Sequence, residues 1–204
     1  MRFLIAFLFL LGLSFGGTFE ELEEKLKSVR TVKVVFIQKT VYSWYPKPDI
    51  SKGYFYASEG GRFRIEYTYP DRVVLVSDGE RIIIYNEEEK EAIIDSVERN
   101  TSPVIESLFF FSRPLGEVFE PVGEIQEGDR KVIIMRPRAR DENIEKVFVE
   151  VNQDLEVVKV KVIDMEKTET IIEFIDVQKN FSPSPGLFTL DLPPDVKIRK
   201  AGGL

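Results

Sequence analysis

The hydrophobic pattern of the chain changes its period once, near residue 30. Before that point, in TFEELEEKLKSVR, apolar side chains recur at the spacing of one helical face: Phe19, Leu22, Leu26 and Val29. Thr18 and Glu21 also have the spacing of a capping box. The pattern therefore predicts a helix over about residues 19–29.

From residue 32 onward the apolar positions alternate with period two, which predicts β-strands. Turn signals such as YPKPDIS, SEGG, TYPD and SDG recur about every 8–14 residues, as in an antiparallel meander. The strand-like segments are VKVVFIQKTVYSW, KGYFYAS, RFRIEYT, RVVLVS, RIIIYN, EEEKEAIID, KVIIMRP, KVFVEVN, EVVKVKVID and ETIIEFIDVQ. We expect about 10–11 strands, too many for a flat open sheet, so the sheet must curve strongly.

Two central segments, Val73 to Val76 and Ile82 to Tyr85, are apolar at every position. A sheet with one face in water would alternate apolar and polar side chains. Both faces are therefore covered, or one face lines an apolar space.

The segment PVIESLFFFSRPLG, residues 103–116, predicts a short helix that is apolar over more than half of its girth. Pro103 fits the first helical position, with Ser102 as N-cap. One face carries Val104, Leu108 and Phe111, flanked by Ile105 and Phe109, while Phe110 lies opposite. Two interpretations stay open: a fixed plug on the concave side of the sheet, or a lid over an apolar cavity.

The segment YSWYP, residues 42–46, falls at the end of a predicted hairpin, where Trp44 is expected to be at least half exposed. It is either a contact patch or a local aromatic cluster that braces the turn.

The N-terminal segment MRFLIAFLFLLGLSFGG has a basic start, an apolar stretch and small residues near its end, as in a secretory signal peptide. We interpret residues 1–17 as this signal peptide and residues 18–204 as a single domain, since no Gly- or Ser-rich linker divides them. The alternative is a short N-terminal membrane anchor.

The composition of the chain limits the kinds of functional site that it can form. The chain has 204 residues, no Cys, no His and a net charge of −7. These counts exclude disulfides, thiol nucleophiles, Cys/His metal sites and the usual neutral-pH base, and they disfavour nucleic acid as a partner. No G-x-S-x-G, phosphate loop or metal-ligand cluster occurs, and the carboxylate runs EELEE and EEEKE suit solvated faces. We therefore predict no catalytic residues, no cofactor and no metal.

The capped helix and the signal-like segment are followed, in order, by FIQKT with Phe36 and Gln38, then GYFYAS and FRIEYTYPDRVVLVSDGERIIIYN, and finally LFTLDLPPDV. This series resembles the LolA family, the periplasmic outer-membrane lipoprotein carrier proteins. The clearest match is Pro70-Asp71 followed by Val76-Ser77-Asp78-Gly79. The resemblance covers nearly the whole exported chain.

The resemblance implies an α+β fold: an unclosed, strongly curved antiparallel barrel with an N-terminal helix and short lid helices on its concave apolar face. It implies a periplasmic carrier, by default a monomer, that takes lipoprotein acyl chains from an inner-membrane ATP-driven transporter and delivers them to an outer-membrane receptor. Carried over by position, the cavity residues are Leu22, Leu26, Val34, Phe36, Phe55, Phe63, Ile65 and Tyr67. The lid residues are Val104, Ile105, Leu108, Phe109 and Phe111.

The chain departs from the family where a basic residue and a proline often precede the Phe-containing strand, because Glu59 and Gly60 stand there. Arg62 or Arg64 is then the candidate to hold the lid, or packing alone holds it. The alternative functions are a lipid- or lipoprotein-sensing module of the same fold, a general periplasmic lipid shuttle, and an assembly factor with a fixed plug. A carboxylate-based hydrolase has no support in the sequence.

Overall fold

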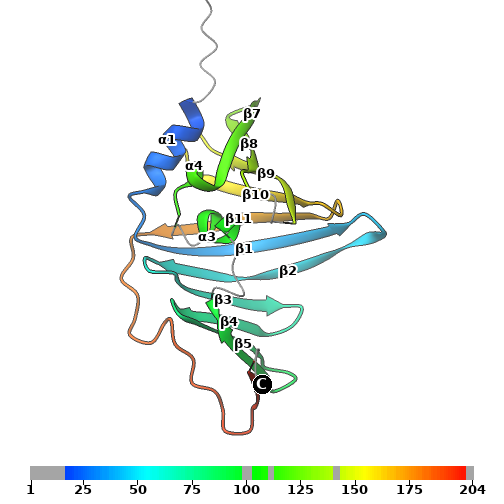
Figure 1. The fold of residues 1–204 in the computed structure, drawn as a ribbon, viewed down its shortest axis with the longest axis vertical. Helices are drawn as coiled ribbons and strands as arrows, with labels where there is room; N and C mark the ends of the chain where they lie inside the picture. The colour runs from blue at the N-terminus through cyan, green and yellow to red at the C-terminus, as the bar shows by residue number, and fades with distance from the viewer. Residues whose placement is uncertain (1–16, 98–102, 110–112, 140–142, 201–204) are drawn as a thin grey trace, which may run out of the picture.

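The computed structural model describes residues 17–97, 103–109, 113–139 and 143–200, and within them one curled sheet carries short helices (Figure 1). The helices are α1 (Gly17–Leu26), α3 (Pro103–Leu108) and α4 (Leu115–Val118). The strands are β1 (Thr31–Tyr42), β2 (Tyr45–Ser58), β3 (Arg62–Tyr69), β4 (Val73–Asp78), β5 (Arg81–Asn86), β6 (Glu91–Ser96), β7 (Phe119–Glu127), β8 (Arg130–Pro137), β9 (Ile144–Val151), β10 (Val157–Asp164), β11 (Glu169–Lys179) and β12 (Lys197–Lys200).

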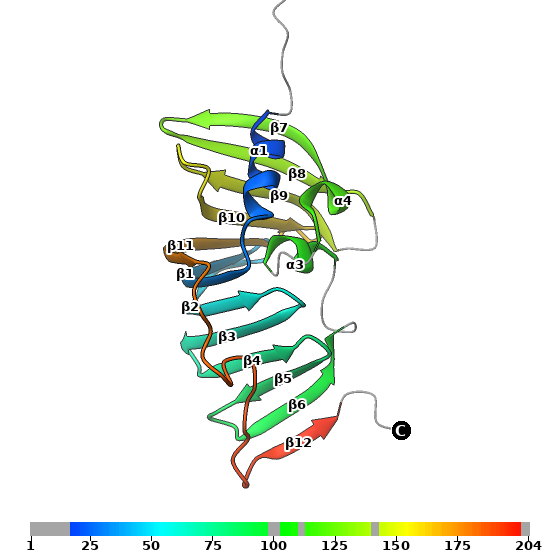
Figure 2. The ribbon, with the colours of Figure 1, turned by 90° about the vertical axis from the view of Figure 1, so that its left-hand side faces the viewer.

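The strand order is β12-β6-β5-β4-β3-β2-β1-β11-β10-β9-β8-β7, with β7 and β12 as the two edges of an unclosed sheet. All neighbours are antiparallel except β12, which runs parallel to β6. The pairing of β1 with β11 joins the two halves of the chain in the middle of the sheet (Figure 2). The predicted fold class is therefore confirmed, with 12 strands in place of the expected 10–11.

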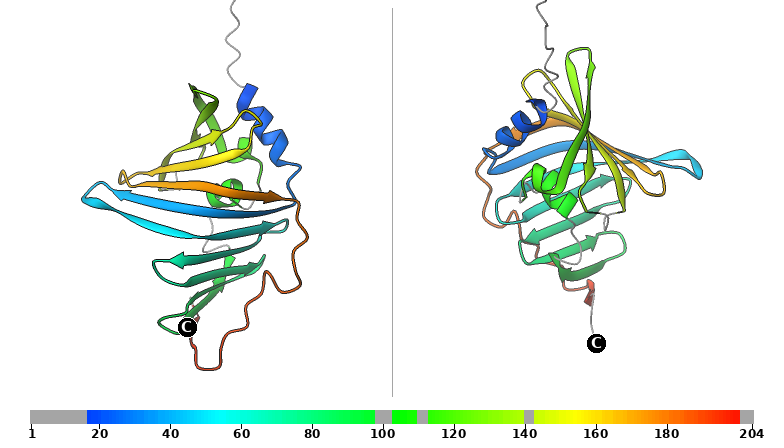
Figure 3. Two further views of the ribbon diagram at one scale, coloured as in Figure 1. Left: turned by 180° about the vertical axis from the view of Figure 1, so that it is seen from behind. Right: turned by 45° about the horizontal axis from the view of Figure 1, so that its top comes forward.

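One face of the sheet is the concave side, and it carries the helices (Figure 3). Phe19 and Leu22 of α1 and Val104 of α3 pack with side chains from β7 to β10 in one buried cluster. A second cluster lies on β1, β2 and β3 around Phe36, Phe55 and Phe63. These burial patterns follow the period-two alternation of the strands, since Val32, Val34 and Phe36 are all buried.

The opposite, convex face meets the segment between β11 and β12, which runs along the sheet to its lower edge (Figure 2). Phe181 lies edge-on to Tyr56, with ring centroids 6.4 Å apart. The sheet buries apolar groups on both faces here, because Val76 and Ile82 are both buried but lie on opposite faces of paired strands. This agrees with the apolar character of both central segments.

Three local predictions need correction. Helix α1 spans Gly17–Leu26 in place of 19–29, and Val29 is buried beyond its end. Thr18 lies inside the helix, where its hydroxyl accepts a hydrogen bond from Lys131 Nζ at 2.9 Å, so it is not the N-cap. The segment YPKPDIS is the first part of β2, not a turn.

Candidate ligand cavity

The concave side of the sheet holds an apolar cavity of about 290 Å³ beneath α3. This volume lies near the lower limit of small-molecule sites, about 300–1,000 Å³. Strands β1, β2, β3, β10 and β11 form its walls, and α3 covers it. The lining residues are Val34, Phe36, Gln38, Phe55, Ile65, Tyr67, Ile105, Phe109, Val162, Thr170, Ile172 and Phe174.

A second, smaller cavity of about 40 Å³ lies on the other side of Phe109, toward α1. Its lining includes Leu22 and Leu26 of α1 and Leu108 of α3. The two cavities share Val34, Phe55, Phe109 and Phe174. Phe109, which directly follows α3, is the shared residue that does not come from the sheet, so it forms a partition between two parts of one apolar interior.

Phe109 follows the last residue of α3, and its backbone N–H donates to the carbonyl of Ile105 at 3.0 Å. Its ring meets the Phe55 ring edge-on, with centroids 6.3 Å apart. It contacts both buried clusters. Val104, five residues earlier, is fully buried in the first of them. Helix α3 is therefore anchored by Val104 and presents Phe109 to the cavity.

The wall on β1 and β3 depends on Gly53 of β2. Phe36 and Tyr67 both pair with Gly53 across the sheet, and their rings meet edge-on at 5.6 Å. A Cβ at position 53 would lie 2.1 Å from the carbonyl oxygen of Glu66 and 3.1 Å from the Phe36 ring. Only glycine leaves room for this arrangement.

Polar groups in the larger cavity lie at one end, which we call the outer end and define by Gln38, Tyr67, Val162 and Thr170. The Gln38 amide donates to Thr40 Oγ1 at 3.4 Å. Burial raises the pKa of Tyr67, so its hydroxyl stays neutral. The outer end is thus polar but uncharged, which suits the join between an apolar ligand and its polar head.

The smaller cavity ends at charged groups. Glu156 and Lys179 both line it, and Glu156 pairs with Lys179 and with Lys25 of α1. Burial alone would raise the pKa of Glu156, but hydrogen bonds from the two lysines outweigh it and hold this pKa below its usual value. The ion pairs join α1 to the residue just before β10 and to β11, at the inner end of the interior.

Most residues that the family resemblance assigned to the cavity lie around it. Val34, Phe36, Phe55, Ile65 and Tyr67 line the larger cavity, and Leu22 and Leu26 line the smaller one. Phe63 is buried in the β1–β3 cluster and lines neither cavity. The role of these side chains in binding stays a prediction.

The lid residues divide between the two cavities. Ile105 faces the larger cavity, Leu108 the smaller one, and Phe109 both, whereas Val104 is an anchor in the core. Phe111 lies outside the described residues. The predicted helix start at Pro103 is confirmed, and the helix ends earlier than the apolar run suggests.

Sequence reasoning missed the wall formed by β10 and β11, which contributes Val162, Thr170, Ile172 and Phe174. The signal was present as the period-two positions of ETIIEFIDVQ. Nothing in the sequence alone indicated that β11 pairs with β1 and so places these side chains opposite Phe36.

The expectation that Arg62 or Arg64 holds the lid is not supported. Both arginines alternate with Phe63 and Ile65 along β3, so they lie on the convex face. Arg64 Nη1 donates to the carbonyls of Leu187 and Thr189, and the Arg62 guanidinium lies over the Phe188 ring at 5.6 Å. They hold the C-terminal segment. Helix α3 instead packs on the core through Val104 and Leu108, and its Glu106 pairs with Arg113 at 2.6 Å.

An unclosed, curled antiparallel sheet with an apolar interior under a short helix defines a class of β-sheet binding proteins. The family model described as outer membrane lipoprotein carrier protein LolA matches residues 27–191, and the chain belongs to this family. Proteins of this family are carriers or binding proteins, not enzymes, which confirms that expectation at the level of the family.

Two curated relatives are named outer-membrane lipoprotein carrier protein. The one from Francisella philomiragia is 23% identical over 200 residues, covering 96% of this chain and 94% of the relative. The one from Chromohalobacter salexigens is 24% identical over 191 residues, covering 92% and 89%. A crystal structure of an uncharacterized conserved protein from Thermus thermophilus aligns with a TM-score of 0.57 at 10% identity, covering 91% of this chain and 98% of that one, and it shows the shared fold.

Proposed function

We propose that the protein is a periplasmic carrier that encloses the acyl chains of lipoproteins in the cavity beneath Phe109. The observation that carries the proposal is an apolar cavity of about 290 Å³ whose walls come from five strands and whose cover comes from one short helix. Membership in the LolA family and the names of the curated relatives support the same cargo.

The energy of acyl chains in water supports direct transfer. Burial of a CH₂ group is worth about 0.8 kcal/mol, so one chain of about 16 carbons contributes about 13 kcal/mol. Three such chains would contribute about 38 kcal/mol, above the ceiling of about 20 kcal/mol for non-covalent affinities. Release through water is then too slow. The cargo must pass between the carrier and an inner-membrane ATP-driven transporter, and between the carrier and an outer-membrane receptor, while the two proteins touch.

The cavity must enlarge to take this cargo, because its volume is at the lower limit for even a small ligand. Phe109 separates it from the smaller cavity, so an outward movement of Phe109 would join the two and free the volume of its own ring. The Phe109 side chain and the acyl chains of the cargo thus compete for contact with the same apolar walls. This competition keeps the cargo from being held too tightly to be delivered.

The proposal includes export, with residues 1–17 as signal peptide and residues 18–204 as the carrier domain. Within the described part of the chain, no helix has the length and apolarity that crossing a bilayer requires.

The test is to purify the wild type, Phe109→Glu and Ile175→Glu from cells that produce lipoproteins, and to identify bound material by mass spectrometry. We expect lipoprotein with the wild type and little with Phe109→Glu, because its carboxylate would enter an apolar site. Ile175 is 58% exposed on β11, so the same substitution there controls for added charge. A folded Phe109→Glu protein that keeps its full cargo would contradict the proposal.

The same preparation separates the alternatives. Phospholipid without lipoprotein would indicate a general lipid shuttle. A signalling protein without either would indicate a sensing module.

A further inference from the structure

The β1–β2 hairpin ends in an exposed aromatic cluster. Trp44 is 74% exposed and Tyr45 is 44% exposed. The Trp44 ring packs against Tyr42 at 5.4 Å and against Tyr45 at 5.9 Å between centroids. We call residues 42–45 the aromatic tip. An exposed group of large apolar side chains marks an interaction site more often than a structural one.

The aromatic tip projects beyond its neighbour on one side. β2 pairs with β3 only from Lys52 onward, so residues 45–51 extend past the end of β3 (Figure 1). Ser43 Oγ donates to the carbonyl of Glu166 in the β10–β11 turn at 3.0 Å. A hydrogen bond to Asp49 raises the pKa of Tyr42 and braces the base of the tip. The tip is therefore held in place before any partner arrives, and binding orders little.

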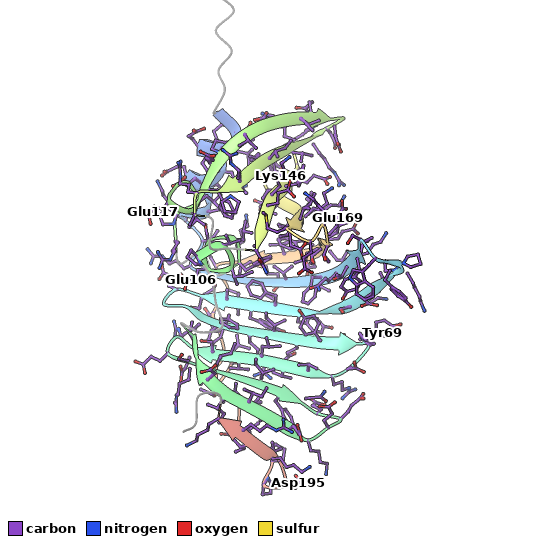
Figure 4. The ribbon with its side chains drawn as sticks, turned by 45° about the vertical axis from the view of Figure 1, so that its right-hand side comes forward. Tyr69, Glu106, Glu117, Lys146, Glu169 and Asp195 are labelled. Atoms are coloured by element: carbon purple, nitrogen blue, oxygen red, sulfur yellow. The ribbon has the colours of Figure 1, made fainter. Side chains whose placement is uncertain are left out.

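Two further exposed apolar side chains lie at the same end of the sheet. Met165 of the β10–β11 turn is 62% exposed, and Tyr69 at the end of β3 is 53% exposed. Figure 4 shows Tyr69 at the end of the sheet opposite to Glu106 of α3. With the aromatic tip they form what we call the apolar rim: Tyr42, Trp44, Tyr45, Tyr69 and Met165.

The apolar rim is continuous with the outer end of the cavity. Tyr69 follows the cavity residue Tyr67 on β3, and Met165 follows Val162 at the end of β10. On β1, the strand that contributes Gln38 to the cavity continues to Tyr42. Each of these three strands thus leads from the cavity wall to a side chain of the apolar rim, exposed in Tyr69 and Met165 and half-buried in Tyr42.

The hairpin segment that carries the aromatic tip differs in charge from the whole chain. Residues 39–49 contain Lys39, Lys47 and Asp49, which is +2 − 1 = +1, against −7 for the full sequence. An anionic surface repels an acidic protein, but it would not repel this hairpin, because the hairpin has no net negative charge. Because its net charge is small, apolar contact and not charge attraction must drive any association.

We propose that the aromatic tip inserts into the headgroup region of a phospholipid bilayer and seats the outer end of the cavity against the membrane. Tryptophan and tyrosine prefer this region, since each ring is apolar and carries one polar group. The idea that acyl chains pass through this contact rests on the proposed function. The membrane contact itself is inferred from the exposed side chains of the apolar rim.

Trp44 is the one tryptophan of the sequence, so its fluorescence reports the tip alone, whatever the N-terminal segment does. The full chain is titrated with phosphatidylcholine vesicles whose acyl chains carry bromine, a short-range quencher. We expect a blue shift and quenching of Trp44. The result should be the same when about a third of the lipid is phosphatidylglycerol, or when high salt is added.

The control is a double variant, Trp44→Phe with Ile198→Trp, which moves the single tryptophan to another exposed site. Ile198 is 52% exposed on β12 at the far edge of the sheet, and a tryptophan there should not be quenched. Equal quenching at both positions would overturn the proposal, as would no quenching of Trp44, or quenching that needs anionic lipid and disappears in salt.

Trp44→Ala is measured in two assays to separate this inference from the proposed function. Vesicle binding, followed by flotation, should weaken at least about tenfold because a large interfacial ring is lost. Lipoprotein retained on purification should not change, because Trp44 lines neither cavity. Loss of cargo with Phe109→Glu but normal flotation of Trp44→Ala would refute the membrane contact and leave the carrier function standing.

Discussion

Replacement of Phe109 by alanine tests whether this ring competes with the cargo. Its ring lies between the two cavities and meets Phe55 edge-on. Truncation joins the cavities and removes packing that stabilises the closed conformation. We expect two opposite effects: the protein becomes less stable, and its affinity for acyl chains rises.

The magnitudes follow from the burial of the ring. A fully buried Phe→Ala change costs about 3–5 kcal/mol, and Phe109 is only half-buried, so we expect about 2 kcal/mol of lost stability. If all of that energy favours the closed conformation, its loss raises the apparent affinity by up to about 30-fold. Contacts that Phe109 makes with bound cargo would be lost too and would reduce this gain in affinity, so about 30-fold is the upper limit.

The assay combines urea unfolding with displacement of a fluorescent fatty acid by a triacylated peptide. Phe181→Ala is the matched control, since Phe181 is also half-buried but packs on Tyr56 at the convex face. It should lower stability without changing affinity. A folded Phe109→Ala protein with unchanged or weaker binding would refute the idea that the empty protein competes with its ligand.

Three other predictions address the wall, the inner end and the lid. Gly53→Ala should destabilise the protein by several kcal/mol, about 3 or more, because its Cβ would lie 2.1 Å from the Glu66 carbonyl oxygen; urea unfolding measures this. The pKa of Glu156 is lowered in the folded state, so its stabilisation is present above the usual pKa and is lost as pH falls through the lowered value; Glu156→Gln should flatten that acid-side loss in unfolding curves. Hydrogen exchange of residues 103–109 should be faster than that of β1 if α3 is a lid, and equally slow if it is a plug.

The sequence was sufficient to predict the strands that have a clear alternation. Val32, Val34 and Phe36 are buried as the period-two pattern requires, and Trp44 is exposed at the hairpin end as expected. β7 was missed because Pro121 and Gly123 interrupt its pattern, and it lies at an edge with a register shift between them. An edge strand with such an irregularity buries too little for a periodic signal.

β12 was missed for a different reason. Its four residues, Lys197–Lys200, are all exposed, so they carry no hydrophobic pattern. Its place is set by long-range pairing with β6 and by the ion pairs of Glu91 with Lys197 and Arg199. Such pairing cannot be read from local sequence, and the same limit hid the cavity wall on β11.

The position of Phe109 in both buried clusters has a consequence for how the cavity opens. If α3 moved away as a unit, Val104 would also leave the cluster that it forms with α1 and with side chains from β7 to β10, where it is fully buried. Complete burial of a valine side chain is worth about 1.5–3 kcal/mol, so that movement costs more than displacement of Phe109 alone. Phe109 lies just beyond the last residue of α3, so a change of its own rotamer and backbone can open the partition while Val104 stays in place. The cheaper opening is therefore a local swing at the end of the helix, and an acyl chain that fills the joined cavities would replace the contacts that Phe109 gives up.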